Sequence, residues 1–305
     1  MFSYTKEQTT FDLGKIKVGG LPGKFPTLMV GTIFYEGEFK DPKNSINKAK
    51  ELIHKQNDIS NLTAVPSLVD IFIYEKEEVG WKIDFALENI DGYFSIDIPE
   101  SEVRIKALEY LDEQDALSRV IYNSFNLGIT VEELEVLKDK TPSGAIILAY
   151  NPQNNNTQGR LDILTDGGKL LDKGLLKMAE EVGIEKTLLD TAATPLGEGA
   201  CETLRSIPVF KSELGLPVGC ALHNTVEAWQ WLEEYDDRET VLKTIDAGID
   251  GLPVLLGADF VYYGPIENAD ISFPYIGMVN KLTAEGAEDY FGQEIYGDHP
   301  YYKLE

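Results

Sequence analysis

The stretch YFSIDIPESEVRIKALEYLDEQDALSRVIYN (93–123) contains the repeating unit that decides the fold. It opens with an apolar run that ends at Asp97, continues with helical spacing from Ser101, and returns to a second apolar run, Arg119–Asn123. This pattern predicts a strand, a helix with Ser101 as its N-cap, and a second strand. Each of the two strands ends in a polar side chain.

The same unit recurs along the whole chain. The other apolar runs predicted as strands are Thr27–Tyr35, Leu68–Tyr74, Ala145–Tyr150, Thr187–Asp190, Val218–Leu222 and Phe260–Tyr263. The helices expected between and after them are Ser45–Asp58, Glu77–Glu88, one capped by Thr130, Gly174–Val182, Gly199–Leu214, Val226–Glu234 and Ile276–Tyr290. Eight units of about 30 residues are typical of a (β/α)8 TIM barrel.

The ends of the chain add to this expectation. The segment from Thr10 to Gly20 reads as a hairpin that turns at Gly14, and such hairpins commonly close the bottom of a barrel. A doubly wound open sheet would carry a glycine-rich phosphate cradle after its first strand, whereas EGEFKDPKN (36–44) is not one. We therefore expect a single domain, residues 1–305.

Composition excludes several classes of function. The chain has 27 basic and 52 acidic residues, a net charge of -25, so nucleic acid and anionic membranes should repel it. Two cysteines form no disulfide framework, and the N-terminus has no apolar core of a signal peptide. No run approaches the roughly 20 apolar residues of a membrane span. We expect a cytoplasmic protein without membrane insertion.

Polar side chains follow the strands where a barrel has its active-site mouth. They are Asp97, Asn123, Asn151, Asp190 and Asn224. Each has a plain structural alternative as a helix cap, a turn residue or a backbone bridge, and that alternative is strongest for Asn151. Together these carboxylates and carboxamides suit hydrogen bonding to a flat, nitrogen-rich ring. The set has no nucleophilic Cys or Lys, which disfavours a barrel aldolase.

Histidine chemistry looks secondary. His223 directly precedes Asn224, so along an extended strand its side chain would point to the opposite side, where it would pack or bond a neighbouring loop. His54 and His299 stand apart from it in the sequence, and no clustered ligands indicate a metal site.

Several longer motifs resemble one known family. GTIFYEG (31–37), IYNSFN (121–126), LLDTAATPLG (188–197), HNTVEAW (223–229) and DFVYYGPIENA (259–269) look like the H subunit of tetrahydromethanopterin S-methyltransferase. The resemblance also covers the opening MFSYTKEQ (1–8) and KVGGLPGKFPT (17–27). This family belongs to the pterin-binding barrels, together with methyltetrahydrofolate:corrinoid methyltransferases and, more distantly, dihydropteroate synthase.

The resemblance implies roles for matching positions. Asp97, Asn123 and Asp190 would hold the 2-amino group, N3 and the nearby edge of a pterin, and Asn224 would lie beside its N5. Glu227, one helical turn later, matches a polar contact of some members. The implied reaction transfers a methyl group between N5 and the cobalt of a corrinoid, which a separate corrinoid-binding protein must bring because the chain shows no cobalamin domain.

Departures from the family pattern leave the particular pterin open. Asp97 is followed by Ile98–Pro99–Glu100 rather than by Ser or Thr and small residues, and EFKDPKN (38–44) is shorter than expected. These differences favour a bacterial-type paralogue that uses tetrahydrofolate. The alternatives are tetrahydromethanopterin as substrate within a larger complex, and a non-catalytic scaffold subunit of a corrinoid system. Pairing into a homodimer is also left open.

Overall fold

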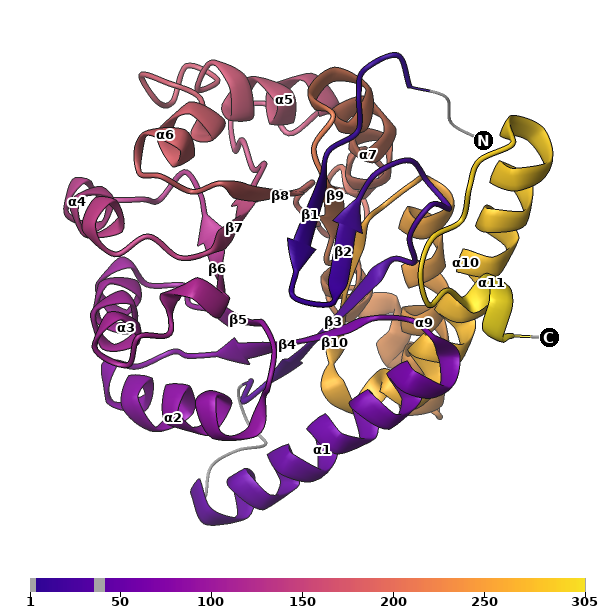
Figure 1. The fold of residues 1–305 in the computed structure, drawn as a ribbon, viewed down its shortest axis with the longest axis horizontal. Helices are drawn as coiled ribbons and strands as arrows, with labels where there is room; N and C mark the ends of the chain where they lie inside the picture. The colour runs from indigo at the N-terminus through magenta and orange to yellow at the C-terminus, as the bar shows by residue number, and fades with distance from the viewer. Residues whose placement is uncertain (1–3, 36–41, 305) are drawn as a thin grey trace. The chain divides into compact units, whose positions relative to one another are not determined.

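The computed structural model describes residues 4–35 and 42–304 and contains a closed barrel of eight strands in the order β10-β3-β4-β5-β6-β7-β8-β9 (Figure 1). The barrel strands are β3 (Leu28–Ile33), β4 (Ser67–Phe72), β5 (Phe94–Asp97), β6 (Val120–Phe125), β7 (Gly144–Leu148), β8 (Lys186–Asp190), β9 (Val218–Cys220) and β10 (Phe260–Pro265). Neighbouring strands pair in parallel from β4 to β7 and between β9 and β10. The predicted TIM barrel is confirmed.

Helices follow the strands as the periodicity predicted. They are α1 (Pro42–Thr63), α2 (Val79–Asn89), α3 (Ser101–Glu113), α4 (Val131–Asp139), α5 (Thr157–Thr165), α6 (Leu175–Glu181), α7 (Ala200–Leu214), α8 (His223–Glu227), α9 (Arg238–Leu255), α10 (Ala269–Phe291) and α11 (Pro300–Lys303). Short 3-10 turns accompany them: η1 (Lys76–Glu78), η2 (Leu117–Arg119), η3 (Gln230–Glu234) and η4 (Ile266–Asn268).

Two helix predictions need correction. The expected helix Val226–Glu234 is instead the short α8 followed by η3. The long helix of that unit is α9, and Asp237 caps its first turn by accepting a hydrogen bond from the Thr240 N–H. The second correction is α5, which is absent from the expected helices: it lies in the polar stretch after β7, where Asn156 caps it by accepting from the Gly159 N–H. The insertion EGEFKDPKN lies partly outside the described residues.

The predicted hairpin is present as β1 (Thr10–Leu13) and β2 (Ile16–Gly19), paired antiparallel. The Thr9 N–H donates to the Gly215 carbonyl at 2.8 Å, and Gly19 packs so closely on Pro217 that an added Cβ would come within 2.9 Å of that ring. Both partners precede β9, so the hairpin lies at the amino end of that strand, the bottom side in a barrel of this kind. The predicted position of the hairpin is confirmed there.

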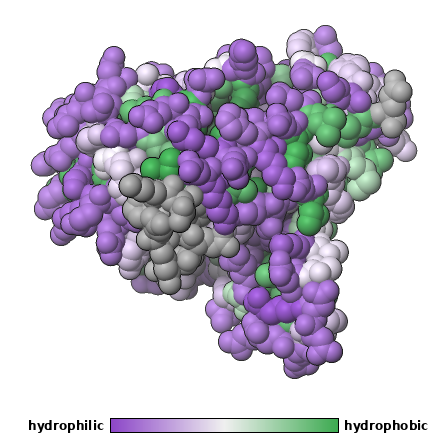
Figure 2. Space-filling view, turned by 90° about the horizontal axis from the view of Figure 1, so that it is seen from below, coloured by the Kyte–Doolittle hydropathy of each residue, from purple (hydrophilic) through white to green (hydrophobic). Residues whose placement is uncertain are grey.

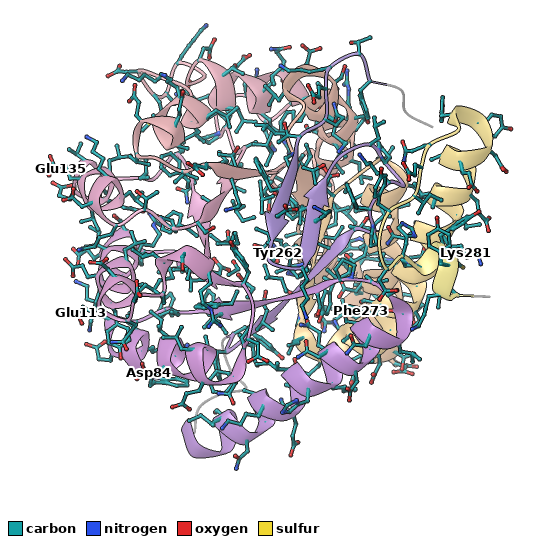
Figure 3. All side chains as sticks on the ribbon, viewed as in Figure 1. Asp84, Glu113, Glu135, Tyr262, Phe273 and Lys281 are labelled. Atoms are coloured by element: carbon teal, nitrogen blue, oxygen red, sulfur yellow. The ribbon has the colours of Figure 1, made fainter. Side chains whose placement is uncertain are left out.

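The described chain forms two compact units: residues 1–31, 52–67 and 190–305 make the first, and residues 32–51 and 68–189 make the second. Within the second unit, helices α2, α3 and α4 each carry exposed acidic side chains, among them Asp84, Glu113 and Glu135 (Figure 3). The face in Figure 2 is mostly hydrophilic with small apolar areas, in keeping with the net charge of -25. Among the described residues, none of the helices has both the length and the apolar character to span a membrane.

Candidate functional site

In the second unit, strand register places Asp97 directly opposite Asn123, and Asp70 opposite Ser95. Registered neighbours point to the same face of a sheet, and side chains alternate along each strand. Tyr122, beside Asn123, turns outward, because its hydroxyl donates to Glu133 on α4. Asn123 and Asp97 therefore face the barrel interior, at or near the carboxyl ends of β5 and β6, as the sequence predicts.

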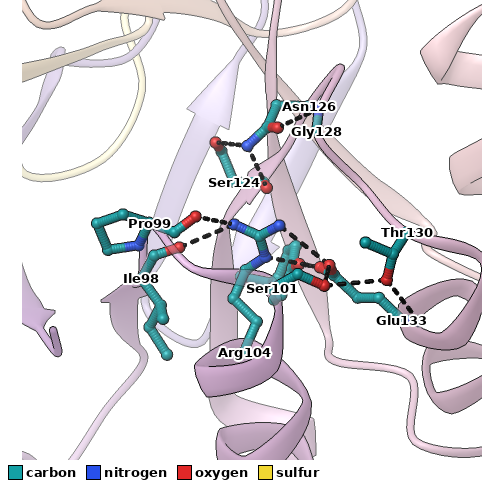
Figure 4. Close-up of polar contacts among 10 residues, drawn as sticks. Ile98, Pro99, Ser101, Arg104, Ser124, Asn126, Gly128, Thr130 and Glu133 are labelled. Atoms are coloured by element: carbon teal, nitrogen blue, oxygen red, sulfur yellow. Dashed lines mark hydrogen bonds and ion pairs between the residues drawn. The ribbon is translucent and has the colours of Figure 1, made fainter. Parts of the chain in front are cut away.

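A buried ion-pair network fixes the turn that follows Asp97 (Figure 4). Arg104 donates to both oxygens of Glu133, at 2.7 and 3.0 Å, and to the Ile98 and Pro99 carbonyls, at 3.1 and 2.6 Å. Both charged side chains are almost completely buried, at 2% and 0% exposure. Because the guanidinium binds two successive carbonyls, it holds the backbone immediately beyond Asp97 in one conformation.

Ser101 belongs to this network rather than to a helix cap. The helix starts at Ser101 itself, and its hydroxyl donates to Glu133 Oε2 at 2.6 Å. The prediction of Ser101 as N-cap is therefore wrong, because the buried carboxylate is a stronger acceptor for this hydroxyl. The predicted cap Thr130 is confirmed: its side chain accepts from the Glu133 N–H at 3.2 Å.

Sequence reasoning missed Asp70, a fully buried carboxylate in the middle of β4. Burial raises its pKa from 3.8 to about 6, although side-chain hydrogen bonds from Ser95, Thr32 and Asn123 lower it. The available signal was a charged residue inside the apolar run SLVDIF (67–72). Since Asp70 shares the face of Asn123, it belongs to the polar interior of this unit.

Asn151 follows β7, but its own loop engages both ends of its carboxamide. Oδ1 accepts from the Gln153 and Asn154 N–H groups at 3.0 Å each, and Nδ2 donates to the Gly159 carbonyl at 3.1 Å. The side chain is 2% exposed. These contacts match its alternative as a turn residue and give no support to ligand binding.

In the first unit, Asp190 ends β8 as predicted and is buried. Its Oδ1 accepts from the Ala192 N–H at 2.7 Å, which stabilises the turn where Ala192 has a φ of 61°. The Thr203 hydroxyl then donates to the Ala192 carbonyl at 2.8 Å. Asp190 thus has a turn-forming role in addition to any contact with a ligand.

Asn224 and Glu227 lie on α8 rather than at the end of a strand, because β9 already ends at Cys220. Both side chains are exposed, and Asn224 stands in the first turn of this helix. Burial raises the pKa of the Glu227 carboxyl, and the charge of Arg238 partly offsets this. This carboxyl is thus partly enclosed although the residue as a whole is accessible.

The His223 side chain is bonded to the neighbouring strand β10. Its Nδ1 lies 2.9 Å from the Tyr262 carbonyl, and because a carbonyl only accepts, Nδ1 carries the proton. Burial lowers the pKa of His223 to about 4, so the ring is neutral at pH 7. The sequence predicted that His223 would pack or bond a neighbouring loop; its ring is bonded instead to the strand β10.

An acidic group beside η4 was also missed. Asp246 accepts from Asn268 Nδ2 at 3.2 Å, and burial followed by the charge of Glu227 raises the pKa of Asp246 to about 7. Burial, and then Asp246, raises the pKa of Asp250 well above its usual value, and Asp250 meets no hydrogen-bond donor. Across the described ranges, no cluster of His, Cys, Asp or Glu is arranged to hold a metal ion.

One cavity of about 520 Å³ lies elsewhere in the second unit. Its lining includes Tyr93 and Ser143, which directly precede β5 and β7, and Lys186, the first residue of β8. Lys186 Nζ donates to Ser143 Oγ at 2.9 Å, and the Tyr93 hydroxyl lies 3.1 Å from the same oxygen. Because the amino ends of barrel strands serve stability, this cavity is a weaker candidate than the strand tips.

The fold defines the class. Similar solved structures include dihydropteroate synthase from Vibrio fischeri, with a TM-score of 0.64, 16% identity and coverage of 91% of this chain and 98% of that one. The Yersinia pestis dihydropteroate synthase in complex with a sulfonamide drug has a TM-score of 0.65, 11% identity and coverage of 91% and 100%. At such low identity these likenesses establish only that the barrel has the dihydropteroate synthase fold.

Sequence comparison then identifies the family. The family described as tetrahydromethanopterin S-methyltransferase MtrH subunit matches residues 6–295. The MtrH protein of Methanothermobacter marburgensis is 40% identical, and that of Methanocaldococcus jannaschii is 36% identical, each over 100% of both chains. The chain belongs to the MtrH family and is an enzyme of the methyltransferase class. The resemblance noted from the motifs is confirmed at the level of the family.

Proposed function

We propose that this protein transfers a methyl group between N5 of tetrahydrofolate and the cobalt of a corrinoid carried by a partner protein. The pterin would be held by Asp97, Asn123 and Asp190, with Asn224 beside N5. The observation that carries the proposal is the register of Asp97 opposite Asn123, with both side chains on the interior face at or near the carboxyl ends of their strands. In the barrels of this class, that end carries the chemistry.

The side chains fit the ligand proposed for them. The edge of a pterin offers an amino group and a ring N–H in a row, and a carboxylate beside a carboxamide oxygen accepts from both. Hydrogen bonds to an ionised carboxylate are about twice as strong as those between neutral groups. The Arg104–Glu133 pair would support Asp97 without contacting the ligand, because the Arg104 guanidinium donates to the Ile98 and Pro99 carbonyls.

The proposed chemistry asks mainly for positioning. A corrinoid on the partner protein would supply the cobalt that gives or takes the methyl group. This chain would align N5 with it, and such positioning can be worth about 7–11 kcal/mol in favourable cases. Asn224 is exposed on α8, where its carboxamide can donate to or accept from N5 as the charge there changes. Glu227, on the same short helix, is proposed as a further polar contact.

Tetrahydrofolate is proposed over tetrahydromethanopterin because of the residues that follow Asp97. Ile98 is buried, and its carbonyl and that of Pro99 are held by Arg104, so this turn differs from the small polar residues expected of the methanogenic subunit. The relatives that match across the chain are named for tetrahydromethanopterin. That pterin, used within a larger complex, is therefore the second candidate.

We also propose that two copies pair through helix α10, in a cytoplasmic protein. Ile271, Met278 and Leu282 are each at least 45% exposed, and their spacing places them along one face of this helix. Identical chains of net charge -25 repel each other. A surface of low charge such as this face is where that repulsion costs least.

The proposal is tested by mixing the protein with methylcobalamin, offering each tetrahydropterin separately, and following the cobalt spectrum. We expect demethylation with tetrahydrofolate and little with tetrahydromethanopterin; the reverse preference contradicts the folate assignment. Asn224→Ala should slow methyl transfer while pterin binding measured by calorimetry is largely kept. A non-catalytic scaffold would give neither binding heat nor a spectral change.

A further inference from the structure

Asp70 is a fully buried carboxylate that has Asn123 among its hydrogen-bonding neighbours. The two side chains share the interior face of neighbouring strands, since Asp70 is in register with Ser95, and Asp97, two residues on, is in register with Asn123. Thr32 Oγ1 donates to Asp70 Oδ2 at 3.1 Å. The Ser95 and Asn123 side chains also hydrogen-bond to this carboxylate.

The carboxylate decides which end of the Asn123 carboxamide faces it. An ionised carboxylate only accepts, so the Nδ2 amino group of Asn123 must point to Asp70. With the pKa of Asp70 raised to about 6, the group is mostly ionised at neutral pH. Asp70 Oδ1 has no donor at full hydrogen-bond geometry, which leaves room for the Asn123 contact to tighten when a ligand binds.

The orientation of the Asn123 carboxamide determines which of its atoms faces the ligand. If Nδ2 is held by Asp70, the carboxamide oxygen of Asn123 is the atom left for the ligand, level with the carboxylate of Asp97. Two acceptors side by side match a ring that offers two neighbouring N–H donors. A ring with a lone pair at one of these positions leaves an acceptor facing an acceptor, and polar sites of this kind reject such a mismatch strongly.

We propose that Asp70 is a positioning residue that fixes the Asn123 carboxamide with its oxygen toward the ligand, and that it thereby selects 2-amino-4-oxo pterins over 2,4-diamino pterins. The 4-oxo ring carries a hydrogen on N3, whereas the 2,4-diamino ring has a lone pair there. The inference rests on the proposed binding of a pterin at Asp97 and Asn123, and it adds how this site recognises the ring.

The test compares two ligands in calorimetric titrations at pH 8: a reduced 2-amino-4-oxo pterin and its 2,4-diamino counterpart. Wild type should prefer the first by at least about tenfold. In Asp70→Asn, the new amide can donate as well as accept, so Asn123 can rotate, and the preference should shrink by about threefold or more. The control Ser95→Ala removes one donor to Asp70 without permitting that rotation, and should keep the wild-type preference.

Each outcome decides the matter. If Asp70→Asn weakens both ligands equally, the role of Asp70 is purely structural and the inference is wrong. If Asp70→Asn does not fold, Asn123→Ala takes its place: loss of the preference supports the inference, and a preserved preference overturns it. If wild type binds neither pterin, the proposed function fails, and this inference fails with it.

Discussion

Replacing Arg104 by Met should cost the fold about 3–5 kcal/mol, because it leaves a buried carboxylate without its cation. Glu133 is 0% exposed and would lose two charge-assisted hydrogen bonds, keeping only those from Ser101 and Tyr122. The Ile98 and Pro99 carbonyls would lose their donor as well. The loss should exceed that of an ordinary core substitution.

The assay is urea denaturation of wild type, Arg104→Met, Glu133→Gln and the double variant. We expect the double variant to be more stable than Arg104→Met, since it no longer buries an unpaired charge. Lys140→Met is the matched control: Lys140 Nζ lies 2.6 Å from Asp112 Oδ2 in a partly exposed pair, so its removal should have a far smaller effect.

The same variants separate stability from function. In the double variant, the turn beyond Asp97 has lost its clamp, so pterin affinity should fall even where stability is largely recovered. A loss below about 1 kcal/mol for Arg104→Met, or wild-type pterin affinity in a folded double variant, would refute the role assigned to this network.

Three further outcomes follow from the structure. Burial raises the pKa of Asp246 from 3.8 to about 7, so the folded protein binds this proton more tightly than the unfolded chain does. The stability gained from the bound proton is complete below pH 3.8 and is lost as the pH rises through 7. Asp246→Asn should therefore melt at a higher temperature than wild type at pH 8 and gain little at pH 4; an equal shift at both values contradicts this. Asn151→Ala should lower the unfolding free energy by about 1–3 kcal/mol while leaving pterin affinity unchanged in the folded protein, because its bonds go to its own loop. Met278→Glu should convert a dimer to monomers in sedimentation equilibrium, and a monomeric wild type would show that α10 is no interface.

The alternation of apolar runs was enough to predict the barrel, since its interior requires short strands and its outer layer requires amphipathic helices. Strand tips could be predicted for the same reason, and Asp97 and Asp190 do end β5 and β8. Asn123 lies two residues before the end of β6, because the strand continues to Phe125 past a register shift. Such an irregularity leaves no simple mark in the hydrophobic pattern.

The roles of Ser101, Asn151 and Asp70 depend on tertiary contacts that the sequence pattern does not reveal. Ser101 could serve as a cap or as a donor to a buried acid, and only the position of Glu133 on the next helix settles this. Asn151 likewise satisfies a loop whose conformation local sequence does not dictate. Asp70 was overlooked because an acid within an apolar run appears unfavourable until its partners on β3, β5 and β6 are known.

The most direct test is a diffraction structure of the protein with a reduced pterin bound. We expect the ring to lie against Asp97 and Asn123, with the 2-amino group and N3 directed at their oxygens. A ring bound instead in the cavity beside Tyr93 and Lys186, at the amino ends of the strands, would contradict it.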